Sequence, residues 1–440
     1  MAKKYKKNNY KFNYMKLFKC ILVLVLIILA INLIKGKIKK TAEQKAVNKV
    51  IEEQEKIPDD STATIVSIGD TLVHSQNFKD AYDSETGIYD FSSFFKYITN
   101  HFDGTVNVGN CEATFAGAKK GYSGYPTFNS PEHLAVDLKE LGLNIMTTAN
   151  NHTLDSGFTG LESTLGYLDE AGLEHTGSAR TQEEQDKILM KDLNGIKTAF
   201  LAFTYGTNGI PVPQGKEFCV NQFAKWKSDW SSYTIDYDFM KKKIEQAKSE
   251  GAEAICVSMH WGIEYQTKEN KEQDQLAEWL VKNGVNVILG CHPHVPQPLK
   301  MITTTDENGV ERKGACIFSM GNFFSAQTFP NTRNTLLLKF AIRKNGQTGE
   351  ISVDKVNYVP LYVYDNGINA KDRYTILDLD AIIEDYESGK GNWSKSMYDL
   401  AKTEKDRLVK IVGPEIDNTK QEENTESDKE NTTNTVENAA

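Results

Sequence analysis

Two short segments of the sequence place metal-binding side chains directly after an apolar run. Asn150, Asn151 and His152 follow one such run, and His292 and His294 follow another. Short apolar runs rich in branched residues predict buried strands, and the carboxyl ends of parallel strands meet at one edge of a sheet. Imidazole and amide groups are ligands for transition metals. The sequence therefore predicts a metal centre of the kind that α/β hydrolytic enzymes assemble at a strand edge.

Four further segments between residues 65 and 325 have the same form, in which an apolar run leads into a polar or glycine-containing turn. In chain order they carry Asp70 and His74, then Glu112, then His260, Glu264 and Tyr265, and finally Asn322. Each has a structural alternative when taken alone, such as a helix cap for Asp70 or a satisfied core position for His260. Six segments of one form in one chain favour a common site instead.

Other polar residues near these turns are candidates for contact with a substrate. Glu264 is a candidate catalytic group beside His260. The candidate substrate-binding residues are Tyr122, Tyr125, Tyr265 and Asn322. Packing is an equally good explanation for the tyrosines, because an aromatic ring beside a turn commonly covers the core.

Between these motifs, strand-like runs alternate with amphipathic helical stretches, which predicts an α/β fold with substantially parallel strands. The predicted strands cover residues 64–68, 106–108, 145–148, 198–203, 254–259, 285–289 and 315–318. The predicted helices cover 131–141, 159–171, 236–250, 271–283 and 378–411. Residues 335–363 alternate as strands do and predict hairpins that complete a second sheet. Residues 61–412 are thus expected to form one domain.

The chain ends predict a membrane anchor and a disordered tail. A basic arm at 1–19 precedes an uncharged apolar run at 20–34, and a charged helical stalk follows at 35–60. With its flanking residues this run is long enough for a single transmembrane helix, and a cleaved signal peptide is the alternative. The lysines of the arm predict a cytoplasmic N-terminus, a cell-membrane location and an extracellular main domain. Residues 413–440 are too polar to form a core.

Charge and cysteine content exclude other classes of protein. The formal net charge is −9, and the middle of the chain is more acidic than the whole because the N-terminal arm is basic. This balance argues against nucleic acid as a partner. The six cysteines form no CxxC pair, and several lie in apolar runs. They are therefore interpreted as buried small side chains rather than a disulfide framework.

The ordered set of motifs resembles the CapA-type capsule-synthesis family, the PgsA-like poly-gamma-glutamate biosynthesis proteins, within the calcineurin-like metallophosphoesterase superfamily. The resemblance covers roughly residues 62–365 and includes the segments around the motifs at 128–131, 160–177 and 257–265. It implies a metallo-dependent phosphatase-like four-layer sandwich, in which two facing β-sheets are flanked by helices. It also implies one or two divalent ions, of which manganese, iron or zinc suit the mixed ligands.

The resemblance further implies a role for each motif residue. The metal ligands would be Asp70, Glu112, Asn151, His260, His292 and His294. Glu112 would bridge two ions in place of the usual aspartate. His152 would contact substrate or act as an acid, held by Asp155. His74 lies four residues after Asp70, where the superfamily has two, and Cys291 replaces a more usual histidine.

Three functions are compatible with these residues. The family implies a membrane-anchored accessory protein that helps make or export poly-gamma-glutamate, or another anionic polymer, with membrane synthetase and export subunits. The chemistry alone allows an exported metal-dependent hydrolase of phosphoester or gamma-glutamyl amide bonds. A structural scaffold with a vestigial site is the third. The sequence contains no P-loop, so polymerisation is not coupled to nucleotide hydrolysis through that motif.

Overall fold

The computed structural model describes residues 14–54 and 58–419. The chain divides after Asp59 into two compact units. In the first, α1 (Tyr14–Gln54) runs through the predicted anchor and most of the predicted stalk as one helix. Within the described residues, no helix has both the length and the apolar character that crossing a bilayer requires. The anchor at 20–34 stays a prediction.

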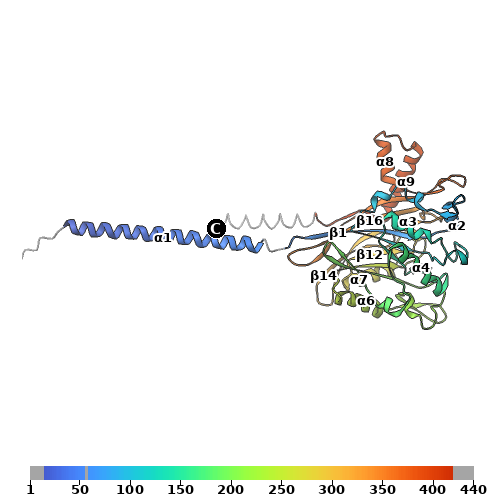
Figure 1. Ribbon diagram of the computed structural model, residues 1–440, viewed down its shortest axis with the longest axis horizontal. Helices are drawn as coiled ribbons and strands as arrows, with labels where there is room; N and C mark the ends of the chain where they lie inside the picture. Colours follow the sequence, from blue (N-terminus) through green and yellow to red (C-terminus); the bar gives the residue numbers. More distant parts are fainter. Residues whose placement is uncertain (1–13, 55–57, 420–440) are drawn as a thin grey trace, which may run out of the picture. The chain divides into compact units, whose positions relative to one another are not determined.

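The second unit contains two large sheets (Figure 1). The first of them includes the first strand of this unit. Its order is β18 (Tyr374–Asp378), β17 (Ile351–Asp365), β16 (Asn334–Lys344), β1 (Ser61–Thr71), β4 (Val106–Cys111), β5 (Ile145–Thr147) and β6 (Glu174–Thr176). β15 (Asn322–Phe324) pairs with β1, and β19 (Ile416–Asp417) pairs with β17. From β1 to β6 the strands are parallel, which brings their carboxyl ends to one edge.

The second sheet is built from the later part of the chain. Its order is β13 (Leu299–Thr305), β14 (Glu311–Ile317), β12 (Val287–Cys291), β11 (Ala254–His260), β8 (Ile196–Thr204) and β7 (Leu189–Leu193). The strands from β14 to β8 are parallel, and the two outer strands are antiparallel. The alternating βα pattern of the sequence produces this parallel centre.

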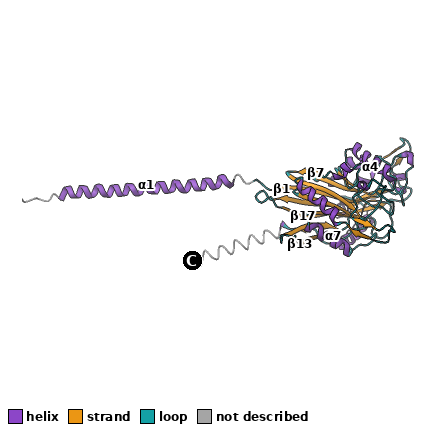
Figure 2. Ribbon diagram, turned by 90° about the horizontal axis from the view of Figure 1, so that it is seen from below, coloured by secondary structure: helices purple, strands orange, loops and turns teal. Residues whose placement is uncertain are grey.

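The two sheets face each other and helices cover their outer faces, which gives the four layers that the resemblance implied (Figure 2). One apolar cluster contains inward side chains of both sheets, such as Ile65 and Leu289. The outer face of the first sheet packs against α3 (His133–Leu141) and α4 (Gly157–Ala171). The outer face of the second packs against α6 (Tyr237–Ser249) and α7 (Lys271–Lys282). Each of these helices begins and ends within two residues of its predicted bounds.

The remaining elements are short or lie at the periphery. The stretch predicted to be helical over 378–411 forms two helices, α8 (Leu379–Glu387) and α9 (Lys395–Val412), which are separated at 388–394 and pack against each other. The short elements are α2 (Ser75–Asp80), α5 (Gln182–Asp186), the pairs β2 (Tyr82–Asp83) with β3 (Ile88–Tyr89) and β9 (Ala224–Trp226) with β10 (Tyr233–Ile235), and 3-10 turns at Ser92–Phe95, Thr99–His101, Ala118–Lys120 and Glu217–Cys219.

Two boundaries differ from the sequence prediction. The hairpin predicted over 335–363 exists, but β16 pairs antiparallel with β1 and therefore widens the first sheet rather than completing the second. β19 lies beyond residue 412, so the folded chain continues into the segment predicted to be a tail. Residues 420–440, the rest of that tail, lie outside the described residues. The five cysteines of the second unit are buried and free, as expected.

Candidate metal centre

The candidate ligands lie where parallel strands of both sheets end. Asp70 is near the end of β1, and Glu112 directly follows β4. His260 ends β11, while His292 follows β12, its neighbour in the second sheet. Because the two sheets face each other with these edges on the same side, residues far apart in sequence come together. The candidate ligands were predicted at strand ends, and the structure places their side chains there.

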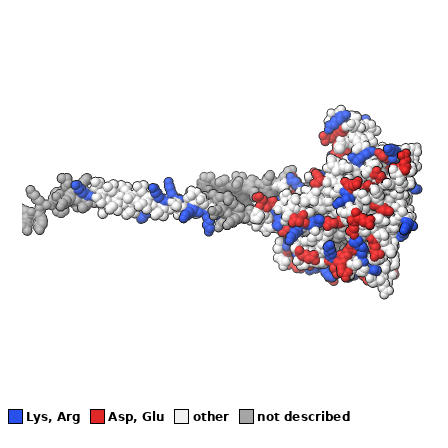
Figure 3. All heavy atoms as spheres, in the orientation of Figure 1, with Lys and Arg blue, Asp and Glu red and all other residues white. Residues whose placement is uncertain are grey.

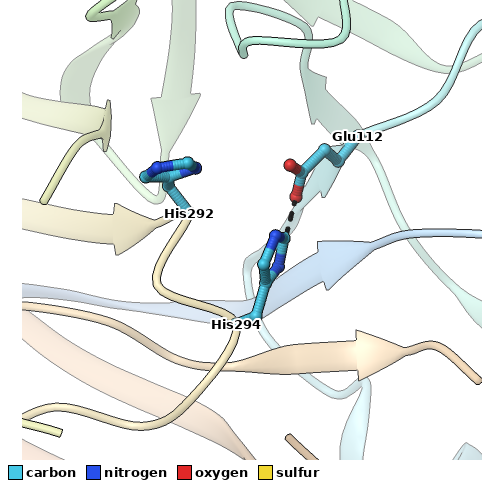
Figure 4. A group of neighbouring side chains, drawn as sticks. All are labelled: Glu112, His292 and His294. Carbon is cyan, nitrogen blue, oxygen red and sulfur yellow. Dashed lines mark ion pairs between the residues drawn. The ribbon is translucent and has the colours of Figure 1, made fainter. Parts of the chain in front are cut away.

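Five of these side chains form a compact group, which we call the ligand cluster: Asp70, Glu112, His260, His292 and His294. One ligand atom from each of Glu112, His292 and His294 lies within 4.8 Å of the others, and the same holds for Asp70, Glu112 and His260. Figure 4 shows His292 and His294 approaching Glu112 from the loop after β12. Ligand atoms around one ion at about 2.1 Å stand roughly 3–4 Å apart. The ligand cluster is therefore close to the spacing that a metal imposes.

Glu112 gives the clearest sign of a missing partner. Its side chain is fully buried, and neither carboxylate oxygen has a hydrogen-bond partner. The nearest imidazole nitrogens, His260 Nε2 and His294 Nδ1, lie 3.4 and 3.9 Å from its oxygens. Burial, together with the neighbouring Asp70 and Glu264 carboxylates, raises the pKa of Glu112 well above its usual value. A buried, unpaired carboxylate is strongly unfavourable, so this position fits a bound cation.

Two histidines of the ligand cluster, His260 and His292, are held in the neutral form that binds metals. Burial lowers the pKa of His260 to about 3. Burial and the neighbouring imidazoles, His260 first, lower the pKa of His292 well below its usual value. The Nδ1 atoms of both rings are buried without a partner. Neutral imidazoles with free lone pairs beside two carboxylates make a donor set suited to manganese, iron or zinc.

Asp70 remains ionised despite its burial. Burial alone would raise the pKa of Asp70, but the hydrogen bond from His294 and the nearby imidazoles outweigh it and lower the pKa. Asn110 Nδ2 donates to Asp70 Oδ1 at 2.8 Å, and the His292 backbone N–H donates to Oδ2 at 3.1 Å. Glu112 belongs to both groups of ligand atoms, and its bridging of two ions stays a prediction.

Asn151, His152 and Asp155 follow β5 and flank the ligand cluster. Asn151 Oδ1 lies 2.7 Å from His260 Nε2, so its amide oxygen would join His260 in holding an ion there. His152 Nδ1 lies 2.7 Å from Asp155 Oδ2, and that oxygen also accepts from the Phe128 backbone N–H. The carboxylate thus orients the His152 ring, as predicted from the resemblance.

The predicted substrate contacts lie in three different environments. Tyr125 is 76% exposed, and Glu264 is also exposed. The Tyr265 ring lies 6.1 Å from the His294 ring, which places it at the rim of the ligand cluster. The Tyr122 hydroxyl donates to Glu132 at 2.8 Å, an arrangement typical of packing.

Asn322 was predicted as a substrate contact but is fully buried. Its Oδ1 lies 3.0 Å from His294 Nδ1, and its Nδ2 donates to Gln327 and to the Thr332 carbonyl. With its polar atoms engaged in this way, Asn322 orients His294 instead of facing solvent. His74 begins α2 with its ring against Phe128 and lies outside the ligand cluster, in keeping with its unusual spacing from Asp70.

Residues that sequence reasoning missed come mainly from the loop after β8. The Tyr205 ring lies 4.8 Å from the His292 ring and is almost parallel to that of His260. Asn208 Oδ1 accepts from Asn151 at 3.0 Å, and its Nδ2 lies 3.4 Å from the His152 ring nitrogens. The signal was present, because this segment is another polar, glycine-containing turn after a buried strand.

The loop that carries His292 and His294 has an unusual backbone. His292 has a φ of 98° and His294 a φ of 61°, both in the left-handed region that favours glycine. Such conformations cost of order 1–3 kcal/mol each and persist where the surrounding structure requires them. The carboxylate of Asp70 helps to hold this loop through the His292 N–H.

Comparisons with known proteins agree with the motifs. The profile of the bacterial capsule synthesis protein PGA_cap matches residues 64–327. The capsule biosynthesis protein CapA of Bacillus anthracis is 26% identical over 291 residues, which are 64% of this chain and 64% of that protein. The PGA biosynthesis protein CapA of Bacillus subtilis (strain 168) is 29% identical over 221 residues, 50% of this chain and 52% of that protein. The chain therefore spans less than two thirds of the length of either relative.

Solved structures also show a distant likeness. The calcineurin-like phosphoesterase YfkN from Bacillus subtilis is 15% identical, with a TM-score of 0.39, and the match covers 81% of this chain and 100% of that one. The family profile covers well over half of this chain and includes every residue of the ligand cluster. The chain belongs to the bacterial capsule synthesis protein PGA_cap family.

Proposed function

We propose that this protein is an accessory protein of capsule synthesis that handles poly-gamma-glutamate, or another anionic polymer, at a divalent-metal centre. The single observation that carries the metal centre is the fully buried Glu112 carboxylate, whose two oxygens have no hydrogen-bond partner although imidazoles lie beside them. Family membership and the names of the two relatives, which refer to capsule and PGA biosynthesis, support the polymer.

The charge of the protein makes a metal useful for this role. The chain has a formal net charge of −9, and Figure 3 shows acidic and basic side chains interspersed on the visible face. A polyanion would gain little from such a surface through long-range attraction. Cations held by the ligand cluster would supply positive charge at one point, where a carboxylate of the polymer could bind.

The ions would be held by the ligand cluster with Asn151, and when bound they supply Lewis acidity toward a carboxylate, phosphoryl or amide oxygen. The protein's own residues fix this arrangement. Asn110 orients Asp70, and Asn322 orients His294. Tyr265 lies at the rim and limits the approach of substrate.

The second candidate function is a metal-dependent hydrolase of phosphoester or gamma-glutamyl amide bonds, with Glu264 as a further catalytic candidate. The His152–Asp155 pair favours it, because a carboxylate at 2.7 Å from Nδ1 keeps a proton on that nitrogen. In that role His152 would hold a second proton at Nε2 and transfer it to a leaving group. Loss of His152 would then abolish hydrolysis while the metal remains bound.

For the chain outside the domain, we propose a single-pass anchor at residues 20–34 with the main domain outside the cell. The lysines of the N-terminal arm support that orientation. The synthetase and export subunits of the polymer would be its membrane partners. Protease added to intact cells should digest the domain and leave the first 19 residues protected, and full protection of the domain would refute this topology.

A histidine replacement separates the functions. His292→Ala removes a ligand, whereas His133→Ala removes a half-exposed histidine on α3 and serves as the control. We expect the first variant to lose bound metal by elemental analysis and to lose polymer production in cells that lack the wild-type gene. The control should retain both. Normal polymer output from a metal-free His292→Ala protein would indicate a scaffold. Hydrolysis of a phosphodiester or of gamma-glutamyl oligomers that needs His152 would favour the enzyme.

A further inference from the structure

A cavity lies between the edge strands of the two sheets, β6 and β7. None of its lining residues belongs to the ligand cluster. It has a volume of about 220 Å³ and is lined by β6 and the loop after it, by α5, β7 and β8, and by α6. At about 30 Å³ for each water, this is room for about seven waters or one small organic molecule. Two of its lining residues are buried polar side chains with unused hydrogen-bonding capacity.

Lys243, on α6, is the first of these. It is 2% exposed, and its ammonium donates to the backbone carbonyl of Gln185. Among residues 14–54 and 58–419, no carboxylate forms an ion pair with it within 4.0 Å. Burial lowers the pKa of Lys243, although Asp186 acts against this shift. A buried ammonium with one neutral acceptor has donors to spare, and an anionic group in the cavity would satisfy them.

His175, on β6, is the second. Its side chain is 7% exposed, and its Nε2 lies 3.3 Å from Asp169 Oδ1. Because a carboxylate accepts, Nε2 carries a proton. Burial lowers the pKa of His175, so the ring is neutral and Nδ1 offers a lone pair. That Nδ1 atom is buried and has no partner, so a ligand that satisfies it must donate a hydrogen bond.

The other charges of the cavity complete the selection. Arg180 is already neutralised by Glu184 and by Asp169, 2.7 Å away, so it is not a free receptor for an anion. The Glu174 carboxylate is paired in the same way with Lys191, 2.6 Å away, so the charged groups on this wall offset one another. Lys243 and His175 therefore decide the ligand, which must carry an anionic acceptor for the first and a hydrogen-bond donor for the second.

We propose that this cavity binds a free amino acid, with its carboxylate on Lys243 Nζ and its ammonium on His175 Nδ1. No residue of the ligand cluster takes part, so the inference does not depend on the metal centre. A simple anion would leave His175 unsatisfied, and a simple amine would leave Lys243 unsatisfied. A zwitterion satisfies both.

The test is calorimetric titration of the full chain, in EDTA, with glycine and with L-glutamate. EDTA removes the contribution of the metal centre. We expect at least one of the two to bind, and Lys243→Met and His175→Phe each to weaken binding by about tenfold or more, as loss of a charge-assisted hydrogen bond does. Lys242→Met removes an exposed lysine from the same helix and should leave binding unchanged. Acetate and methylammonium, each half of the ligand, should bind at least about tenfold more weakly.

Three outcomes would overturn the proposal. They are the absence of binding of both amino acids to the wild type, binding undiminished in both variants, and acetate binding as tightly as glycine. The two variants lie on different elements, so if one does not fold, as judged by circular dichroism, the other decides. Binding that is lost in Lys242→Met as well would place the ligand elsewhere and would also refute the assignment.

Discussion

Replacing Glu112 by Gln should change stability in opposite directions with and without a divalent cation. The wild-type carboxylate is fully buried, without hydrogen-bond partners, beside Asp70. The amide has nearly the same shape, carries no charge and can donate to the Asp70 carboxylate. Relief of an unsatisfied buried group is worth about 1–3 kcal/mol. In EDTA the Glu112→Gln variant should therefore be more stable than the wild type by about this amount.

With a cation present the order should reverse. A ligand at 100 times its Kd stabilises the folded state by about 2.7 kcal/mol. With an unfolding entropy of about 2.1 cal/mol/K per residue, 1 kcal/mol shifts the Tm of a domain of this size by about 1.3 °C, so the wild type should gain about 3–4 °C. The variant lacks the carboxylate that both groups of ligand atoms share, and it should gain little.

The assay is thermal unfolding of the full chain in EDTA and in manganese or zinc chloride, at one pH. Glu140→Gln is the matched control, because it removes an exposed carboxylate from α3 and should leave the metal response intact. Equal Tm gains with metal for the wild type and for Glu112→Gln would show that Glu112 is not a ligand. A variant that is less stable than the wild type in EDTA would refute the account of its buried carboxylate.

Three further predictions concern residues around the site and in the core. Asn322→Leu keeps the volume but removes the hydrogen bond to His294, so metal affinity measured by chelator competition should fall about 10–100-fold, and no change would refute an orienting role. Burial raises the pKa of Asp137 to about 6, against the pull of the Phe91 N–H. The wild type therefore loses stability as pH rises from 3.8 through 6. Asp137→Asn should be more stable than the wild type by about 1–2 kcal/mol at pH 7.5, after allowance for solvent screening, and equal to it below about pH 3.8 in denaturant titrations. Gly166→Ala, at an open helical position in α4, should stabilise by about 0.5–1 kcal/mol in the same titrations, and a lower midpoint would contradict this.

Much of the architecture could be predicted because the spacing of apolar residues within one strand or helix identifies that element. The strands that end at His260 and before His292 are continuous apolar runs, and apolar periodicity identifies such elements without tertiary information. The cluster of ligands followed from one further rule, that parallel strands share a carboxyl edge. The spacing of apolar residues could not predict which strand pairs with the 335–363 hairpin. Its pairing with β1 depends on a contact between strands about 270 residues apart.

The details of the site were less accessible for the same reason. Asn322 reads as a turn residue in the sequence, yet β15 pairs with β1 and buries its amide against His294. Tyr122 reads as a loop tyrosine, but its hydroxyl is engaged by Glu132. Asn208 reaches His152 only because of how its loop turns. Side-chain direction within loops depends on tertiary contacts that spacing along the chain does not encode.

The left-handed conformations of His292 and His294 have an evolutionary consequence. Glycine adopts this backbone without strain, so laboratory selection for heat resistance alone should drift toward glycine at both positions and discard the site. Natural variants that keep histidine at 292 and 294 must be under selection for a property other than thermal stability. Retention of both histidines in natural variants would thus indicate that their side chains have a function.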